Sequence, residues 1–161
     1  PPEKGSPVSY SLLLNLVSAA DASTKDILWA FISRYIPGAT PQSEPMLDRL
    51  ADFAINYYED FVKPSKQFRA ASDQERAAML DLVARLRALP PGADAEAIQN
   101  EVFEVGKQAG FEPLRAWFQA LYEVLLGQSQ GPRFGSFVAI FGVDRTIALI
   151  DKALAGELLA G

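Results

Sequence analysis

The stretch LRAWFQALYEVLLG, residues 114–127, decides the fold because its apolar residues keep helical spacing without a break. Apolar side chains recur at i, i+3, i+4, i+7, i+8 and i+11, which places them on one face of an α-helix. These residues are Leu114, Trp117, Phe118, Leu121, Tyr122 and Leu125. Gly127 stands where helices commonly end in a left-handed residue, a conformation that favours glycine. The stretch therefore predicts an amphipathic helix with an aromatic-rich buried face.

The sequence after this helix predicts a loop and two further helices. Residues 128–132 are polar residues, glycine and proline, a composition typical of loops. Gly142 separates the two apolar helical patterns that follow. The first pattern consists of Phe134, Phe137, Val138 and Phe141, and the second of Val143, Ile147, Ile150 and Leu154.

Five helices are expected before residue 114, each bounded by start or stop signals. The signals are Ser6-Pro7 for the first helix, Ser23 with Asp26 and then Pro37-Gly38 for the second, Pro64 after a third over about 43–62, Ser72 with Glu75 for the fourth, and Asp94 and Gly110 for the fifth. The third helix carries an apolar stripe of Leu47, Leu50, Phe53, Ala54, Tyr57, Tyr58 and Phe61. We therefore expect an all-α fold, a helical bundle of about eight helices. Pro90-Pro91-Gly92 is the strongest internal break, and it predicts subdomains at residues 1–90 and 91–161.

Composition excludes several classes of function. The 161 residues are 49% hydrophobic and 22% charged, which is typical of a globular protein. The absence of cysteine and histidine excludes disulfides, Cys/His zinc sites, thiol nucleophiles and Ser-His-Asp catalysis. Carboxylate pairs such as Glu101 with Glu104 are interpreted as solvated helix faces, so we expect no catalytic or metal-binding residues. The chain has no apolar run of the roughly 18–20 residues that would span a membrane and no signal peptide, which predicts a cytoplasmic protein with no membrane partner. It begins at Pro1 without a methionine, so we expect a segment of a longer protein.

A basic stretch at residues 63–69 is the first candidate binding site. Lys63, Lys66 and Arg69 surround Phe68, and such a stretch could follow a phosphate backbone. The alternative interpretation is a cation at a helix end followed by a solvated loop. The net charge of −5 argues against a general polyanion binder.

The residues around the predicted loop are the second candidate. Gln128, Arg133, Ser136 and Phe137 could form a groove for a planar polar ligand, since Arg133 can present a bidentate fork or stack on a base. Most aromatic rings of the 114–127 helix are expected in the core. One edge of its apolar face, near Trp117 and Phe118, is expected to stay open for stacking on a base. The same residues are also explained by the alternative interpretation, an ordinary turn between two helices that binds no ligand.

Three segments resemble one known family. WFQALYEVLLG at 117–127, followed by GPRFGSF at 131–137, is similar to the C-terminal signature of class I lysyl-tRNA synthetases. The earlier run INYYEDFVKPSKQFR at 55–69 resembles the helical segment that precedes this signature. The similarity covers about residues 6–155, and a shorter Gly-Pro form also occurs in the related glutamyl-tRNA synthetases.

The resemblance implies a non-catalytic tRNA-recognition fragment. Residues 1–90 would be a helical connector and residues 91–161 an anticodon-binding helical cage. The partners would be the anticodon loop of tRNA and the N-terminal catalytic domain of the same chain. ATP and magnesium would be cofactors of that catalytic domain and not of this fragment, whose lack of histidine is incompatible with the family's His-Ile-Gly-His motif. RNA contacts are expected from Arg133, Gln128, Ser136, Phe137, Trp117, Phe118, Lys63, Lys66 and Arg69. The alternatives are a helical protein–protein interaction or scaffold domain, and the anticodon domain of a glutamyl-type synthetase.

Overall fold

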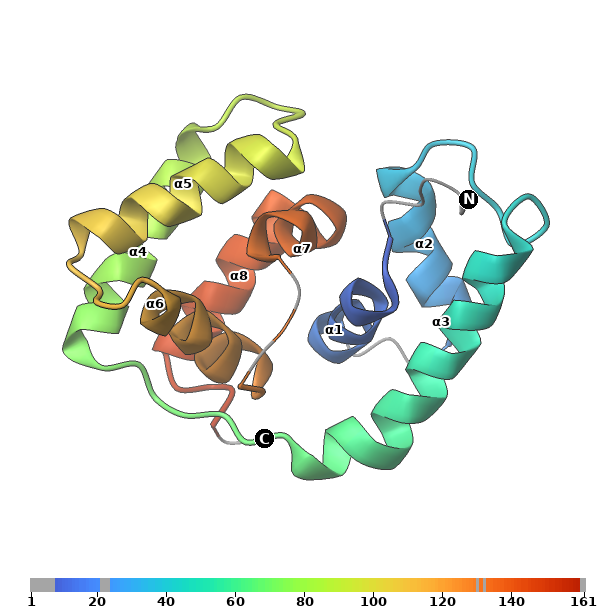
Figure 1. Cartoon of the computed structure of the whole chain (residues 1–161), viewed down its shortest axis with the longest axis horizontal. Helices are drawn as coiled ribbons and strands as arrows, with labels where there is room; N and C mark the ends of the chain where they lie inside the picture. The colour runs from blue at the N-terminus through green and yellow to red at the C-terminus, as the bar shows by residue number, and fades with distance from the viewer. Residues whose placement is uncertain (1–7, 21–23, 130, 132, 160–161) are drawn as a thin grey trace. The chain divides into compact units, whose positions relative to one another are not determined.

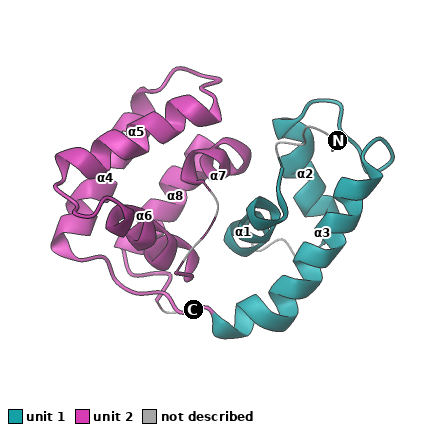
Figure 2. Cartoon of the chain, in the orientation of Figure 1, with its two compact units in different colours: residues 1–65 teal, residues 66–161 magenta. Residues whose placement is uncertain are grey.

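A computed structural model describes residues 8–20, 24–129, 131 and 133–159 of the chain. All regular structure in these residues is helical, with eight α-helices and no strand (Figure 1). The all-α prediction is therefore confirmed. The helices divide into two compact units, residues 1–65 and residues 66–161, coloured separately in Figure 2.

Unit 1 consists of three α-helices, the last of which continues into a π-helical and a 3-10 turn. They are α1 (Tyr10–Ala20), α2 (Lys25–Tyr35) and α3 (Pro45–Tyr57), with α3 continued by a π-helical turn η1 (Tyr58–Val62) and a 3-10 turn η2 (Lys63–Ser65). Helix α3 packs against both α1 and α2. Asp48 of α3 accepts hydrogen bonds from the Lys25 ammonium at 2.9 Å and from the Trp29 indole N–H at 3.0 Å, which ties α2 to α3.

Unit 2 contains the other five α-helices. They are α4 (Asp73–Ala88), α5 (Ala95–Gln108), α6 (Arg115–Leu121) with a π-helical continuation η3 (Tyr122–Leu126), α7 (Phe134–Phe141) and α8 (Val143–Leu154). Helix α5 packs most extensively against α7, and α4 packs against α5 and α8. Gly135 permits the close approach of α5 and α7, because a Cβ there would overlap the Ala95 carbonyl oxygen and lie 2.8 Å from Gln99 Cβ.

Most predicted helix boundaries match the structure. Ser72 accepts from the Glu75 N–H while the Glu75 carboxylate accepts from the Ser72 N–H, so the capping box of α4 is confirmed. Asp94 caps α5, and Gly127 ends η3 with φ 70°. The predicted caps at Ser6-Pro7 and Ser23 lie outside the described residues, and the observed cap of α2 is Thr24.

The division into compact units differs from the predicted boundary after residue 90. The units divide between Ser65 and Lys66, because α4 packs on α5 and α8 and so belongs to unit 2. Pro90, Pro91 and Gly92 form a turn within unit 2. A Pro/Gly turn that ends a helix carries the same sequence signal as a linker between domains.

Among the described residues, no helix combines the length and the apolar character needed to cross a membrane.

Candidate nucleic-acid interface

Residues 66–69 of the basic stretch lie beside the start of the predicted loop, within unit 2. The extended segment 66–69 runs along Gly127, and the Gln67 N–H donates to the Gly127 carbonyl oxygen at 3.0 Å. The Phe68 ring packs on Gly127 so closely that a Cβ there would lie 3.2 Å from the ring. Lys66 Nζ lies 5.2 Å from the centroid of the Phe68 ring. The basic stretch thus borders the start of the 127–133 loop.

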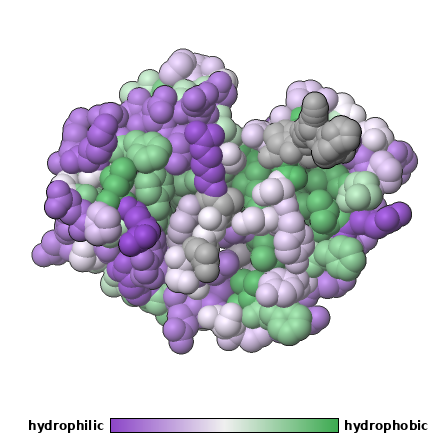
Figure 3. Space-filling view, viewed as in Figure 1, coloured by the Kyte–Doolittle hydropathy of each residue, from purple (hydrophilic) through white to green (hydrophobic). Residues whose placement is uncertain are grey.

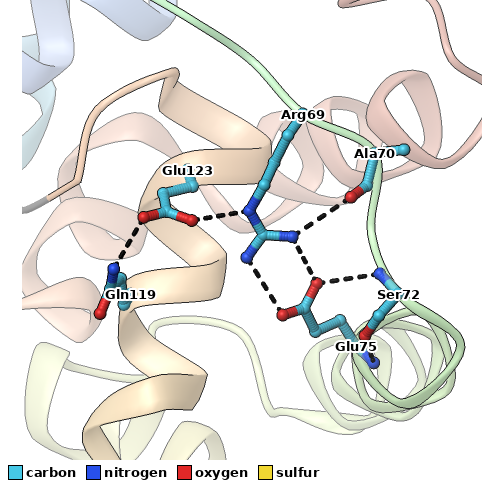
Figure 4. A network of polar contacts seen from close by, with 6 residues as sticks. All are labelled: Arg69, Ala70, Ser72, Glu75, Gln119 and Glu123. Carbon is cyan, nitrogen blue, oxygen red and sulfur yellow. Dashed lines mark hydrogen bonds and ion pairs between the residues drawn. The ribbon is translucent and has the colours of Figure 1, made fainter.

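Arg69 is held by acidic residues on two helical segments (Figure 4). Its Nε donates to Glu123 Oε1 at 2.6 Å, while Nη1 and Nη2 donate to the two Glu75 oxygens at 2.7 and 3.1 Å. Hydrogen bonds from Arg69 are the leading cause that lowers the pKa of Glu75. The pKa of Glu123 is lowered first by a hydrogen bond from Gln119 and then by Arg69. The charge of Arg69 is therefore already compensated within the protein, which disfavours the predicted phosphate contact.

The 127–133 loop is anchored at both ends. Gly127 is bound by Gln67, and the Gln128 N–H donates to the Tyr122 carbonyl oxygen at 3.3 Å. At the other end, the Gly135 N–H donates to the buried Gln99 Oε1 at 2.6 Å. Of the intervening residues, 130 and 132 lie outside the described part of the chain.

Three polar residues of the predicted groove keep features that suit a ligand contact. Arg133 is exposed, and no ion pair to it is found among the described residues. Ser136 is half-buried in the first turn of α7. Gln128 Nε2 is buried without a hydrogen-bond partner in the described part of the chain. An unpaired buried donor costs about 1–3 kcal/mol.

Two aromatic residues of the predicted site belong to the core instead. Trp117 is fully buried and donates its indole N–H to the Val102 carbonyl oxygen at 2.9 Å. Phe137 is fully buried and stacks on Phe141 with ring centroids 5.2 Å apart. Neither ring can stack on a base, so both predicted RNA contacts are corrected. In each case adjacent helices cover the apolar face, which is the usual result for helical spacing of this kind.

Phe118 and Lys63 make contacts other than those of segment 66–69 with Gly127. Phe118 is half-buried and meets the exposed Phe103 of α5 edge to face, with centroids 5.3 Å apart. Lys63 belongs to unit 1, where its ammonium lies 3.8 Å from Glu59 on an exposed surface. The structure does not join either residue to the junction of segment 66–69 with Gly127.

Phe68 and Glu123 are site residues that sequence reasoning did not assign. Phe68 stands inside the basic stretch, and an aromatic residue between cations was the available signal. Glu123 lies 54 residues from its partner Arg69. No local pattern predicts a pair at that separation.

Unit 1 carries an exposed apolar stripe along α3 and η1. Its members follow the spacing of a single helix face and remain open to solvent: Met46 (69% exposed), Phe53 (62%), Tyr57 (44%) and Phe61 (62%). Figure 3 shows hydrophobic side chains at the surface along the α3 ribbon of Figure 1. The exposed Asp60 lies next to Phe61 in η1, which is an unfavourable setting for a phosphate.

Known proteins resemble this chain over most of its length. A family model described as an anticodon binding domain matches residues 16–154. The chain is 56% identical over 153 residues to the lysine–tRNA ligase of Roseobacter denitrificans, covering 95% of this chain and 29% of that protein. It is 48% identical over 147 residues to the lysine–tRNA ligase of Rickettsia bellii, covering 91% of this chain and 28% of that protein. The chain thus spans less than a third of the length of these relatives. No solved structure gives a significant match.

Proposed function

The chain belongs to the anticodon-binding domain family, and from this premise we propose that unit 2 recognises the anticodon loop of lysine tRNA through its 127–133 loop. The observation that carries the proposal is an exposed arginine, Arg133, on a loop whose two ends are fixed by Gln67 and Gln99. Proteins read single-stranded RNA loops by stacking on splayed bases and by bonding their Watson–Crick edges. A guanidinium serves both purposes.

The polar groups beside Arg133 support the same proposal. Gln128 Nε2 is buried and has no acceptor among the described residues, so pairing with an RNA oxygen requires the side chain to turn outward; the cost of the unpaired donor favours that change. The Lys66 ammonium lies at the Phe68 ring beside Gly127, close to where the loop begins. Together these residues provide hydrogen-bond donors and a positive charge at one edge of unit 2.

The proposed interface neutralises few phosphates. Arg69 is paired with Glu75 and Glu123, and Lys107 lies 3.5 Å from Glu104. The proposed phosphate contacts are Lys66 and Arg133, and the net charge of the chain is −5. Single-stranded contacts give a slope of about −0.7 per phosphate in log K against log salt. We therefore expect weak binding by this chain alone, with a slope of about −0.7 to −1.4.

Binding of anticodon stem-loops tests the proposal. Fluorescence anisotropy would compare stem-loops of lysine and glutamate tRNAs with the wild-type chain, Arg133→Ala and Arg115→Ala. Arg115 is a matched exposed arginine at the other end of the α6–η3 helix, roughly 18 Å from Gly127. We expect Arg133→Ala to lose about 1–3 kcal/mol of affinity for the lysine stem-loop, and Arg115→Ala to lose little. Equal, sequence-blind binding by wild type and Arg133→Ala would contradict the proposal, whereas preference for the glutamate stem-loop would indicate a glutamyl-type specificity.

We further propose that this chain is the non-catalytic part of a class I lysine–tRNA ligase that acts in the cytoplasm. In this proposal ATP and magnesium bind to the catalytic part of the longer ligase. The His-Ile-Gly-His motif expected of that part cannot occur in a chain without histidine. Aminoacylation assays offer a direct test. This chain alone should not charge tRNA with lysine, whereas the full-length ligase should. Aminoacylation by the chain alone would refute the assignment.

A protein contact through unit 1 is the second candidate, and the exposed stripe of Met46, Phe53, Tyr57 and Phe61 favours it. Exposed apolar patches of this kind mark interaction sites. We propose that the stripe packs against the remainder of the ligase, because the matched relatives are more than three times as long as the region they share with this chain. Unit 1 would then connect the anticodon-reading unit to the catalytic part.

Paired serine substitutions at Phe53 and Phe61 test this contact. In the 161-residue chain they should leave the unfolding midpoint nearly unchanged, because both rings are 62% exposed. In the full-length ligase they should lower the unfolding midpoint and the rate of aminoacylation. Unchanged stability and activity of the full-length variant would argue against the contact, and Asp60→Ser supplies a control at an exposed polar position of the same turn.

A further inference from the structure

The hydrogen bonds of Arg69 leave it little capacity to bind RNA directly. An arginine side chain has five N–H donors. In Arg69 the single Nε donor is used by Glu123, both Nη1 donors by Glu75 and the Ala70 carbonyl oxygen, and one Nη2 donor by the second Glu75 oxygen. Four of the five donors are therefore engaged within the protein.

These hydrogen bonds join three segments of unit 2 (Figure 4). Glu75 lies in the first turn of α4, where its Oε1 also accepts from the Ser72 N–H. Glu123 lies in η3, where its Oε2 accepts from Gln119 Nε2 at 2.8 Å. Arg69 itself follows Gln67 and Phe68, which contact Gly127 at the end of η3. The Arg69 network therefore fixes segment 66–69 and η3 relative to each other at the point where the 127–133 loop begins.

We propose that Arg69, acting with Glu75 and Glu123, is a positioning residue for anticodon-loop recognition. It holds Phe68 against Gly127, with Lys66 over the Phe68 ring, and so sets the position from which the 127–133 loop presents Gln128 and Arg133 to RNA. This inference rests on the function proposed above. It assigns Arg69 a role that differs from a phosphate contact, and the two roles predict opposite effects for a change at Glu123.

Glu123→Gln separates the two roles by the sign of its effect. If Arg69 were a phosphate contact, loss of the competing carboxylate would free its guanidinium and remove a negative charge near the RNA, so affinity would rise. If Arg69 positions the loop, loss of the 2.6 Å charged hydrogen bond loosens segment 66–69 on η3 and affinity falls. We expect a fall of about tenfold for the lysine stem-loop, in the range of a single well-formed charged hydrogen bond.

The experiment measures stem-loop affinity of the whole 161-residue chain as a function of salt. Arg69→Gln and Glu123→Gln should weaken binding by similar factors, and the double variant should bind no more weakly than the weaker single variant. Both should keep the wild-type salt slope, whereas Lys66→Gln should reduce its magnitude by about 0.7. Glu104→Gln removes a paired surface carboxylate elsewhere in unit 2 and should leave the affinity unchanged.

A conservative variant keeps the test decisive if Glu123→Gln does not fold. Arg69→Lys retains the positive charge but cannot reproduce the fork that reaches Glu75 and Glu123 together. It should weaken binding if Arg69 positions the loop, and it should retain most affinity if Arg69 supplies a charge to phosphate. Unchanged or tighter binding by Glu123→Gln or Arg69→Lys would overturn the positioning role. Failure of the wild-type chain to distinguish stem-loops would instead overturn the proposed function.

Discussion

Substitution of Gly127 by alanine should destabilise unit 2 through two separate effects. Gly127 has φ 70°, where a residue with a Cβ is strained by about 1–2 kcal/mol. The added Cβ would also lie 3.2 Å from two atoms of the Phe68 ring, which must then move by a few tenths of an ångström. Overpacking costs about 1–3 kcal/mol, and the half-exposed ring places the cost near 1 kcal/mol. We expect a total loss of about 2–3 kcal/mol in the free energy of unfolding.

Gly110→Ala is the matched control for this change. Gly110 also follows a helix and has φ 82°, but no atom lies within 4 Å of its hypothetical Cβ. It should therefore lose only the backbone term of about 1–2 kcal/mol. The difference of about 1 kcal/mol between the two variants is attributable to Phe68, and it should vanish when both are measured in a Phe68→Leu background.

Tryptophan fluorescence during urea unfolding provides the assay. The chain has two tryptophans, Trp29 in unit 1 and Trp117 in unit 2, so a Trp29→Phe background leaves a reporter of unit 2 alone. Trp117 is fully buried, and its emission should shift to longer wavelength when unit 2 unfolds. If Gly127→Ala lost no more stability than Gly110→Ala, the inferred packing of Phe68 on Gly127 would be wrong.

Three further changes test other contacts of unit 2 by the same assay. Gly135→Ala should cost more than 3 kcal/mol, since its Cβ would meet backbone of α5, including Gln99 N at 2.9 Å, and backbone cannot move aside as a flexible side chain can. Ser72→Ala should cost about 1 kcal/mol by removing the cap of α4. Because the pKa values of Glu75 and Glu123 are lowered in the folded chain, their contribution is complete above the ordinary glutamate pKa of about 4.3 and is lost as pH falls through the lowered values. Wild type should therefore lose more stability than Glu75→Gln between pH 5 and about pH 3, and parallel pH profiles for the two would count against the network.

Local signals predicted the helices of this chain well. The Ser72 and Glu75 pair, Asp94 and Gly127 each act within a few residues, because a cap satisfies backbone groups of its own helix. Such contacts depend on sequence spacing alone. The positions of these helix ends could therefore be predicted without any knowledge of tertiary packing.

The apolar stripe of the third helix illustrates what spacing cannot resolve. Leu47, Ala54 and Tyr58 of the predicted stripe are buried, whereas Phe53 and Phe61 are exposed. The apolar sector of α3 is wide, and α1 and α2 cover only part of it. Helical periodicity gives the direction of each side chain but does not show how many neighbouring helices will cover that direction.

Part of the predicted site was misassigned in sequence analysis for a related reason. Arg69 was predicted as an RNA contact because it lies in a basic stretch, but its partner Glu123 comes from a distant segment. The charge of a residue is visible in the sequence, whereas its compensation depends on the fold. The same limit applies to Trp117, whose indole N–H is satisfied by Val102 on another helix.

The residues that support the proposed site (its frame) differ in exposure from the residue proposed to contact RNA. Trp117, Phe137 and Gly135 have no access to a ligand, yet they fix the helices between which the 127–133 loop is held. Arg133 has the reverse properties, since its side chain is exposed and no ion pair to it occurs among the described residues. Substitutions in the frame should change stability and affinity together, because the loop moves when its supports move. Arg133→Ala should change affinity with little change in stability, and this separation is the behaviour expected of a residue that reads RNA directly.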